Sequence, residues 1–129
     1  MSDIFFTSDH HFSHARILEL GRSQFKTIEE HDATLISNWN SVVKPEDTVW
    51  HLGDFSMGGT FLEHFEKLNG QIHICFGNHD RQSYLHKERF ASYQDYKQLK
   101  IGKYHLTLCH YAMRTFLFSE KDFFFPSRP

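Results

Sequence analysis

The sequence is poor in cysteine, contains no long apolar run and has no excess of positive charge. Its two cysteines, Cys75 and Cys109, form no Cys-x-x-Cys pair and lie in apolar stretches, so we expect buried free thiols and no disulfide. No apolar run approaches the roughly 20 residues that cross a bilayer, and the Met-Ser-Asp start lacks the basic and apolar regions of a secretory signal. These absences predict a cytoplasmic protein that makes no use of a membrane.

The charge balance is close to neutral, with 14 Lys and Arg against 16 Asp and Glu. The formal net charge of -2 excludes a global positive field, and basic and aromatic residues are not interleaved, so there is no strong nucleic-acid signature. The 129 residues, 40% of them hydrophobic, predict one folded domain. The clear excess is histidine, with 11 in the chain, and histidine is the commonest metal ligand. Function is therefore sought first among the histidines.

Short apolar runs alternate with helical patterns through the first two thirds of the chain. Runs at 3–7, 48–52 and 71–76 predict buried strands, and the segments 15–20, 28–42 and 60–68 predict the helices between them. Thr27 and Glu30 form a capping box for the longest helix, whose apolar face is expected to carry Ile28, Leu35, Trp39 and Val42. This alternation predicts an α/β protein with a mostly parallel sheet.

The last third begins with two alternating runs, at 93–100 and 103–109. They predict an antiparallel hairpin that turns at Ile101 and Gly102.

Polar side chains follow each predicted strand, where an open α/β sheet places its ligand site. They are Asp9 and His11, Asp54 after Gly53, the tetrapeptide Asn78, His79 and Asp80 after Gly77, and His110 after the hairpin. Carboxylate, amide and imidazole donors together suit Mn, Fe, Zn, Ni or Co better than Ca or Mg. The sequence therefore predicts a transition-metal site.

Local geometry suggests how these donors divide. In an extended segment Asp9 and His11 point to one side while His10 points away, and Gly53 allows a sharp turn that lets Asp54 lie between two ions. Two metals about 3.5 to 4 Å apart clamp a phosphate and activate a shared hydroxide.

In order and spacing, Asp9-x-His11, Gly53-Asp54, Gly77-Asn78-His79-Asp80 and His110 resemble the motifs of the calcineurin-like metallophosphoesterases. The residues around these motifs resemble those of a small bacterial and phage branch of that superfamily, and the resemblance covers residues 3–113. It implies a layered α/β/β/α fold with two sheets packed face to face and a dinuclear metal site at their edge.

The resemblance also implies a role for each site residue. Asp9 and His11 would bind the first of two divalent transition-metal ions, with manganese favoured. Asp54 would bridge the ions, and Asn78 and His110 would bind the second. His79 would act as general acid or would stabilise transition-state charge, and Asp80 would orient its ring.

One family motif is not found in this chain. The family closes its site with Gly-His-x-His, one further ligand for each metal, whereas no histidine follows His110 here. We therefore expect a metallophosphoesterase core at 1–113 that lacks its last strands, followed by an atypical phenylalanine-rich tail at 114–129. The sheet edge left exposed favours a homodimer.

The expected function is hydrolysis of phosphate esters through two metal ions and a bridging hydroxide, on a phosphorylated small molecule or a nucleotide. The alternative is a weak or inactive relative that binds metal or a phosphorylated partner without turnover. Among the remaining histidines, His51 is expected to support the loop beside Asp54, and His14 lies either near the site or on a solvent-facing helix. The others are expected on surfaces with no chemistry: His31, His64, His73, His86 and His105.

Overall fold

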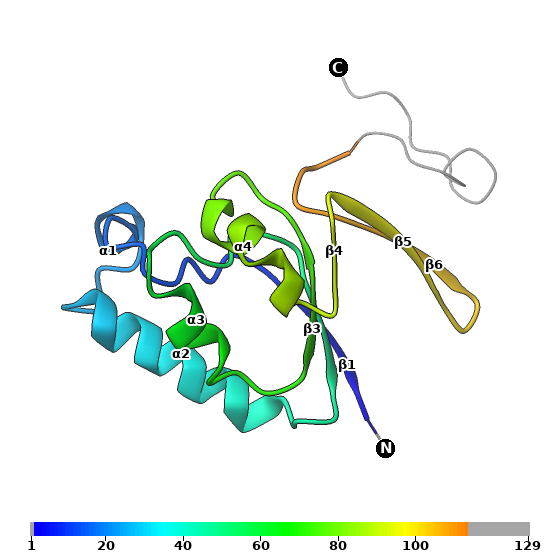
Figure 1. The fold of residues 1–129 in the computed structure, drawn as a ribbon, viewed down its shortest axis with the longest axis horizontal. Helices are drawn as coiled ribbons and strands as arrows, with labels where there is room; N and C mark the ends of the chain where they lie inside the picture. Colours follow the sequence, from blue (N-terminus) through cyan, green and yellow to red (C-terminus); the bar gives the residue numbers. More distant parts are fainter. Residues whose placement is uncertain (1, 114–129) are drawn as a thin grey trace.

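The computed structural model describes residues 2–113, and a parallel sheet lies at its centre (Figure 1). Four strands pair in chain order: β1 (Ile4–Thr7), β2 (Thr48–His51), β3 (Gln71–Cys75) and β4 (Ser92–Gln94). Thr7 pairs with His51, and His51 pairs with Ile74, so the first three strands end almost level. The predicted α/β fold with a parallel sheet is confirmed.

Helices connect the strands. They are α1 (Ile17–Leu20), α2 (Ile28–Val42), α3 (Phe61–Phe65) and α4 (Arg81–Leu85), with a 3-10 turn η1 at Lys87–Arg89. The α2 helix begins as predicted, because the Thr27 hydroxyl accepts a hydrogen bond from the Glu30 N–H at 3.1 Å.

The expected apolar face of α2 is wrong at its end. Val42 is 58% exposed, and the next residue, Val43, is buried instead. Val43 follows the last helical residue and has extended backbone angles, so its side chain does not follow the helical period.

The hairpin forms a second, separate sheet. Strands β5 (Tyr96–Ile101) and β6 (Tyr104–Cys109) pair antiparallel, and Gly102, with φ of 58°, lies in the turn. The predicted strand at 93–100 is in fact two strands, because Ser92–Gln94 joins the parallel sheet before Asp95 leads into β5. The turn also lies one residue later than predicted, at Gly102 and Lys103.

Two apolar clusters hold the layers together. The larger lies between the parallel sheet and helices such as α2 and α3, and includes Trp39, Phe55 and Phe61. The smaller contains Trp50, Cys75 and Leu108, which join the parallel sheet to the hairpin. Residues 2–113 thus contain three layers in the order helices, parallel sheet and hairpin (Figure 1). The fourth layer of the expected α/β/β/α arrangement is not found within these residues.

Both cysteines are free thiols, as expected, although Cys109 is only partly buried. No helix in residues 2–113 is long and apolar enough to cross a membrane. The predicted tail at 114–129 lies outside the described residues.

Candidate metal centre

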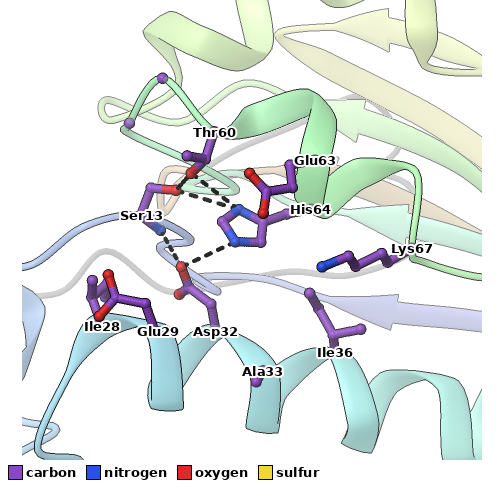
Figure 2. Close-up of a pocket in the computed structure, with 12 residues that line it drawn as sticks. Ser13, Ile28, Glu29, Asp32, Ala33, Ile36, Thr60, Glu63, His64 and Lys67 are labelled. Carbon is purple, nitrogen blue, oxygen red and sulfur yellow. Dashed lines mark hydrogen bonds and ion pairs between the residues drawn. The ribbon is translucent and has the colours of Figure 1, made fainter.

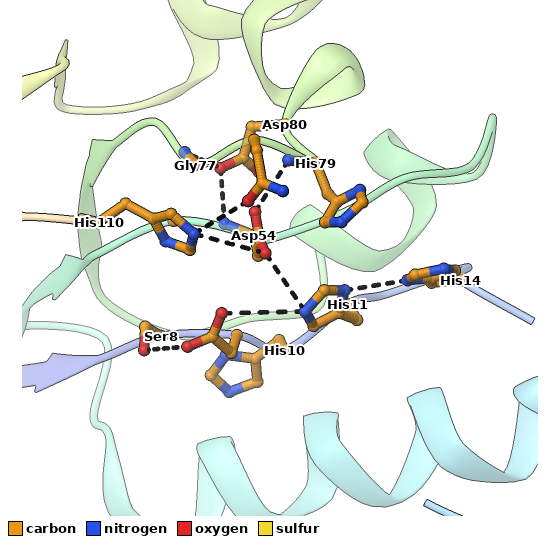
Figure 3. A network of polar contacts seen from close by, with 12 residues as sticks. Ser8, His10, His11, His14, Asp54, Gly77, His79, Asp80 and His110 are labelled. Carbon is orange, nitrogen blue, oxygen red and sulfur yellow. Dashed lines mark hydrogen bonds and ion pairs between the residues drawn. The ribbon is translucent and has the colours of Figure 1, made fainter. Parts of the chain in front are cut away.

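Three loops meet beyond the carboxyl ends of β1, β2 and β3. The loop after β1 runs alongside the loop after β2, because the N–H of Asp9 donates to the Gly53 carbonyl and the N–H of His11 donates to the Asp54 carbonyl, each at 2.9 Å. The His79 N–H, from the loop after β3, donates to Asp54 Oδ1 at 2.9 Å. The predicted meeting of the strand ends is therefore present, with Asp54 at its centre (Figure 3).

The loop after β1 has an unusual backbone. Asp9 and His11 have φ angles of 63° and 55°, in the left-handed region that most residues avoid. His10 lies between them and packs its ring on Phe12 and Trp39, with ring centroids 5.4 Å and 5.1 Å away. The side chains alternate as the sequence predicted, but left-handed residues, and not an extended strand, produce the alternation.

The first half of the site contains three donors. His11 Nε2 lies 3.8 Å from Asp9 Oδ1 and 3.5 Å from Asp54 Oδ2, and one ligand atom from each of the three residues lies within 4.8 Å of the others. First-row metals bind such atoms at about 2.0 to 2.2 Å, which leaves ligands of one ion a few ångströms apart. The donor set therefore fits a divalent transition metal.

The second half lies on the other side of Asp54. His110 Nε2 is 3.6 Å from Asp54 Oδ2 and 3.1 Å from Asn78 Oδ1. The opposite ring nitrogen, Nδ1, is 2.8 Å from the Leu52 carbonyl and donates its proton there. In the tautomer with one proton, on Nδ1, the lone pair of Nε2 faces Asp54 and Asn78, as a metal-binding imidazole requires. All five sequence-predicted ligands are thus brought together: Asp9, His11, Asp54, Asn78 and His110.

His14 and His79 lie beside His11 on the outer side of the site (Figure 3). The His14 ring is 5.6 Å from that of His79, and its Nδ1 is 3.0 Å from Nδ1 of His11. Burial lowers the pKa of His11, and the Asp54 carboxylate offsets this in part. Burial and then the neighbouring His79 lower the pKa of His14. Both imidazoles are therefore neutral near pH 7, and the alternative that placed His14 near the site is the correct one.

Asp80 has a different set of contacts from the predicted one. Its Oδ2 accepts the N–H groups of Asp54 and Gly77, each at 2.6 Å, and its Oδ1 accepts the Phe55 N–H at 2.7 Å and the Ser83 hydroxyl at 3.0 Å. These donors occupy both oxygens, so the carboxylate ties the loop after β2 to the loop after β3. Within residues 2–113 it makes no hydrogen bond to the His79 ring.

Two glycines allow this close approach. A Cβ on Gly53 would lie 2.6 Å from His110 Nδ1, and a Cβ on Gly77 would collide with the Asp54 side chain. Gly53 also has a φ of 107°, which favours glycine.

A buried histidine pair supports the loop after β2, as expected for His51. The Gly53 N–H donates to His51 Nδ1 at 3.1 Å, so the His51 proton lies on Nε2 and is donated to His10 Nδ1 at 2.9 Å. Burial lowers the pKa of His10 to about 4 and that of His51 well below its usual value. The pair is therefore uncharged.

No sequence signal identified the residues that hold the backbone of Asp9 and His10 in place. Arg22 donates to the carbonyl of His10 at 2.7 Å and to that of Asp9, and its Nη1 also lies 2.8 Å from His31 Nε2. His31 was expected on a surface, but it is fully buried. Its Nδ1 lies 2.7 Å from Asp32 Oδ1. Arg22 and these residues form no recognisable sequence motif. Their contacts exist only in the folded chain.

Comparison with known proteins agrees with this geometry. The model of the calcineurin-like phosphoesterase superfamily domain matches residues 3–122, so the chain belongs to that superfamily. It is 39% identical over 105 residues to an uncharacterized protein of Methanocaldococcus jannaschii, covering 78% of this chain and 58% of that protein. It is 45% identical over 85 residues to the Gene 66 protein of Mycobacterium phage L5, covering 62% of this chain and 41% of that protein.

A crystal structure of a protein of unknown function from Aquifex aeolicus has the same fold, with a TM-score of 0.73 and 31% identity over 92% of this chain and 65% of that one. The chain spans about half the length of the curated relatives that it matches.

Proposed function

We propose that the protein is a metal-dependent phosphoesterase that hydrolyses phosphate esters with two divalent metal ions. The observation that carries this proposal is the position of Asp54 Oδ2, which lies 3.5 Å from His11 Nε2 and 3.6 Å from His110 Nε2. A carboxylate oxygen between two metal-binding imidazoles is suited to bridge two ions. Bound in this way, such ions lower the pKa of coordinated water and neutralise phosphate oxygens.

The ligands divide around Asp54 into two groups. Asp9 and His11 would hold one ion, and Asn78 and His110 would hold the other. The mixed oxygen and nitrogen donors support a first-row transition metal, for which we propose manganese. Asp9 is half exposed, with 50% of its side chain accessible, which leaves an open side for the phosphate group of a small molecule or a nucleotide.

His79 would act on the leaving group. Its N–H is fixed to Asp54 Oδ1, and its ring centroid lies 5.7 Å from that of His11, on the side of the site that is also flanked by His14. The ring would donate a proton to the leaving oxygen or stabilise its charge. Asp80 would position His79 and Asp54 through the backbone, without touching the ring.

The test combines metal analysis with turnover. Metal content is measured by elemental analysis of protein loaded with manganese, and hydrolysis is followed with p-nitrophenyl phosphate and bis-p-nitrophenyl phosphate. We expect two ions per chain and turnover that chelation abolishes. Asp54→Asn should lose both, whereas His79→Gln should keep the metal and lose about 100-fold or more in rate. His105→Gln, at an exposed position on β6, is the matched control and should retain both.

Each other outcome has a definite meaning. Full turnover in Asp54→Asn would contradict the bridging role of Asp54. One ion per chain with turnover would contradict only the dinuclear site and would leave the phosphoesterase activity supported. Metal binding without turnover would contradict the enzyme proposal and would favour the alternative, a relative that binds metal or a phosphorylated partner.

A further inference from the structure

A second group of chemically active side chains lies outside the metal centre, in an open pocket of about 530 Å³. The pocket is formed by α2, the start of α3 and the loop after β1 (Figure 2). Ser13, Thr60, His64 and Asp32 line one side, and the α2 residues Ile28, Ala33 and Ile36 give it an apolar wall. None of these residues has a part in the proposed phosphoesterase reaction.

The polar side chains form one connected chain of contacts. His64 Nδ1 lies 3.3 Å from the Ser13 hydroxyl and 3.3 Å from the Thr60 hydroxyl, which also bond to each other. The opposite nitrogen, His64 Nε2, lies 3.4 Å from Asp32 Oδ2 (Figure 2). Serine, histidine and aspartate thus follow one another in the order that activates a nucleophilic hydroxyl.

The protons in this chain have a defined arrangement. Asp32 Oδ2 accepts the Ser13 N–H at 2.9 Å, and Asp32 Oδ1 accepts the proton of His31 Nδ1 at 2.7 Å. Arg22 donates to the other nitrogen of His31, so His31 is a donor toward Asp32. The Asp32 carboxylate beside His64 Nε2 favours the tautomer with its proton on Nε2. His64 Nδ1 is then left as an acceptor for a hydroxyl proton.

The imidazole is held firmly in this orientation. The His64 side chain is only 13% exposed, and its ring stacks on Phe12 at 5.5 Å and 19°. The buried carboxylate of Asp32 is 5% exposed. A base that is fixed by stacking and by a buried carboxylate needs little reorganisation to take a proton.

Ser13 is placed unlike an ordinary surface serine. Its φ of 63° lies in the left-handed region, and a Cβ on Gly58 would lie 2.5 Å from the Ser13 Cβ, so the Gly58 backbone runs directly against it. Within residues 2–113 the N–H groups of Gly58 and Gly59 make no hydrogen bond, and both glycines line the pocket. They are candidate donors to a developing oxyanion.

We propose that Ser13, His64 and Asp32 form a second, metal-independent reactive centre that cleaves small carboxylic esters. Ser13 Oγ attacks the ester carbonyl carbon while its proton passes to His64 Nδ1. The bond to the leaving alkoxide breaks, and that oxygen takes the proton from His64. Water then attacks the acyl-serine and gives one proton to His64, which returns it to Ser13 Oγ. The products are a carboxylic acid and an alcohol.

The apolar wall of the pocket indicates the substrate. The apolar residues Ile28, Ala33 and Ile36 line the pocket and would contact a short acyl chain. Glu63 and Lys67 also line the pocket and would offer polar contacts to the alcohol part. A pocket of this volume matches a small ester and not a polymer.

The experiment uses the full chain in EDTA, which removes the metal centre from the reaction. The protein is treated with a fluorophosphonate, the modified residue is located by mass spectrometry, and hydrolysis of p-nitrophenyl acetate is followed in parallel. We expect labelling of Ser13, with loss of labelling and hydrolysis in Ser13→Ala. His64→Gln should slow labelling by about 100-fold or more. Ser41→Ala is the matched control, since Ser41 is an exposed serine that donates to the Asn38 carbonyl.

Three results would overturn the proposal: no labelling, labelling of Thr60 or Ser41 in place of Ser13, or labelling of Ser13 at an unchanged rate in folded His64→Gln. A network that only braces the loop against α2 would give the first result. Thermal unfolding of each variant shows that it is folded. Ser13→Ala removes one oxygen from a partly exposed site, so it tests the proposal even where His64→Gln does not fold.

Discussion

Asp80→Asn is expected to destabilise the fold strongly although it removes only one charge and almost no volume. The carboxylate accepts three backbone N–H groups and one hydroxyl, and at 4% exposure it is shielded from water. If the Asn amide nitrogen takes the place of Oδ2, it faces the N–H groups of Asp54 and Gly77. If the amide nitrogen takes the place of Oδ1, it faces the Phe55 N–H. The Ser83 hydroxyl can then rotate and accept a hydrogen bond from the amide.

Each lost hydrogen bond to a charged group costs about 1.5 to 3 kcal/mol, so losing one or two of them amounts to about 1.5 to 6 kcal/mol. For a domain of this size that lowers Tm by roughly 5 °C or more. Urea unfolding of metal-free protein measures the change. Glu88→Gln removes one negative charge at an exposed position and should stay within about 0.5 kcal/mol of the wild type. If Asp80→Asn unfolds at the same urea concentration as Glu88→Gln, the proposed tie between the two loops is wrong.

Three further predictions concern other parts of the molecule. Because burial lowers the pKa of His10 to about 4 while the unfolded chain titrates near 6.5, metal-free protein should lose stability as pH falls from 6.5 to 4, by about 1.4 kcal/mol per pH unit from this group. In urea titrations His10→Gln should show a smaller pH slope, and an equal slope would contradict the assignment. Burial raises the pKa of Cys75 to about 11, so a thiol reagent at pH 8 should modify the partly exposed Cys109 first, and rapid labelling of Cys75 in folded protein would contradict its burial. The predicted homodimer would pair two copies through the sheet edge that the missing last strands leave exposed, so light scattering should give a dimer mass. A monomeric wild type would refute this prediction.

Much of the fold could be predicted from the sequence because its signals are local. The apolar runs that became β1, β2 and β3 are short and end in polar residues, and Thr27 marks the start of α2 directly. These local signals fail where contacts with distant parts of the chain determine the secondary structure. Nothing local shows that the run at 93–100 divides at Asp95, since that division depends on a parallel neighbour, β3, far away in sequence.

The five candidate ligands could be named from the sequence because each follows a strand and belongs to a specific motif. The left-handed backbone of Asp9 and His11 could not be predicted, because left-handed residues other than glycine have no specific sequence signal. The pocket beside Ser13 was also missed. Its residues come mainly from two loops and two helices, and on a helical pattern His64 is indistinguishable from a surface histidine.

The position of His110 ties the site to the architecture. Asp9, His11, Asp54 and Asn78 all follow strands of the parallel sheet, whereas His110 follows β6 of the hairpin. An ion bound by both Asp54 and His110 would link the hairpin to the parallel sheet, next to the small apolar cluster of Trp50, Cys75 and Leu108. Ligand at 100 times its Kd adds about 2.7 kcal/mol to the folded state. The stability of the contact between the hairpin and the parallel sheet would then depend on the metal concentration, as would the rate of catalysis.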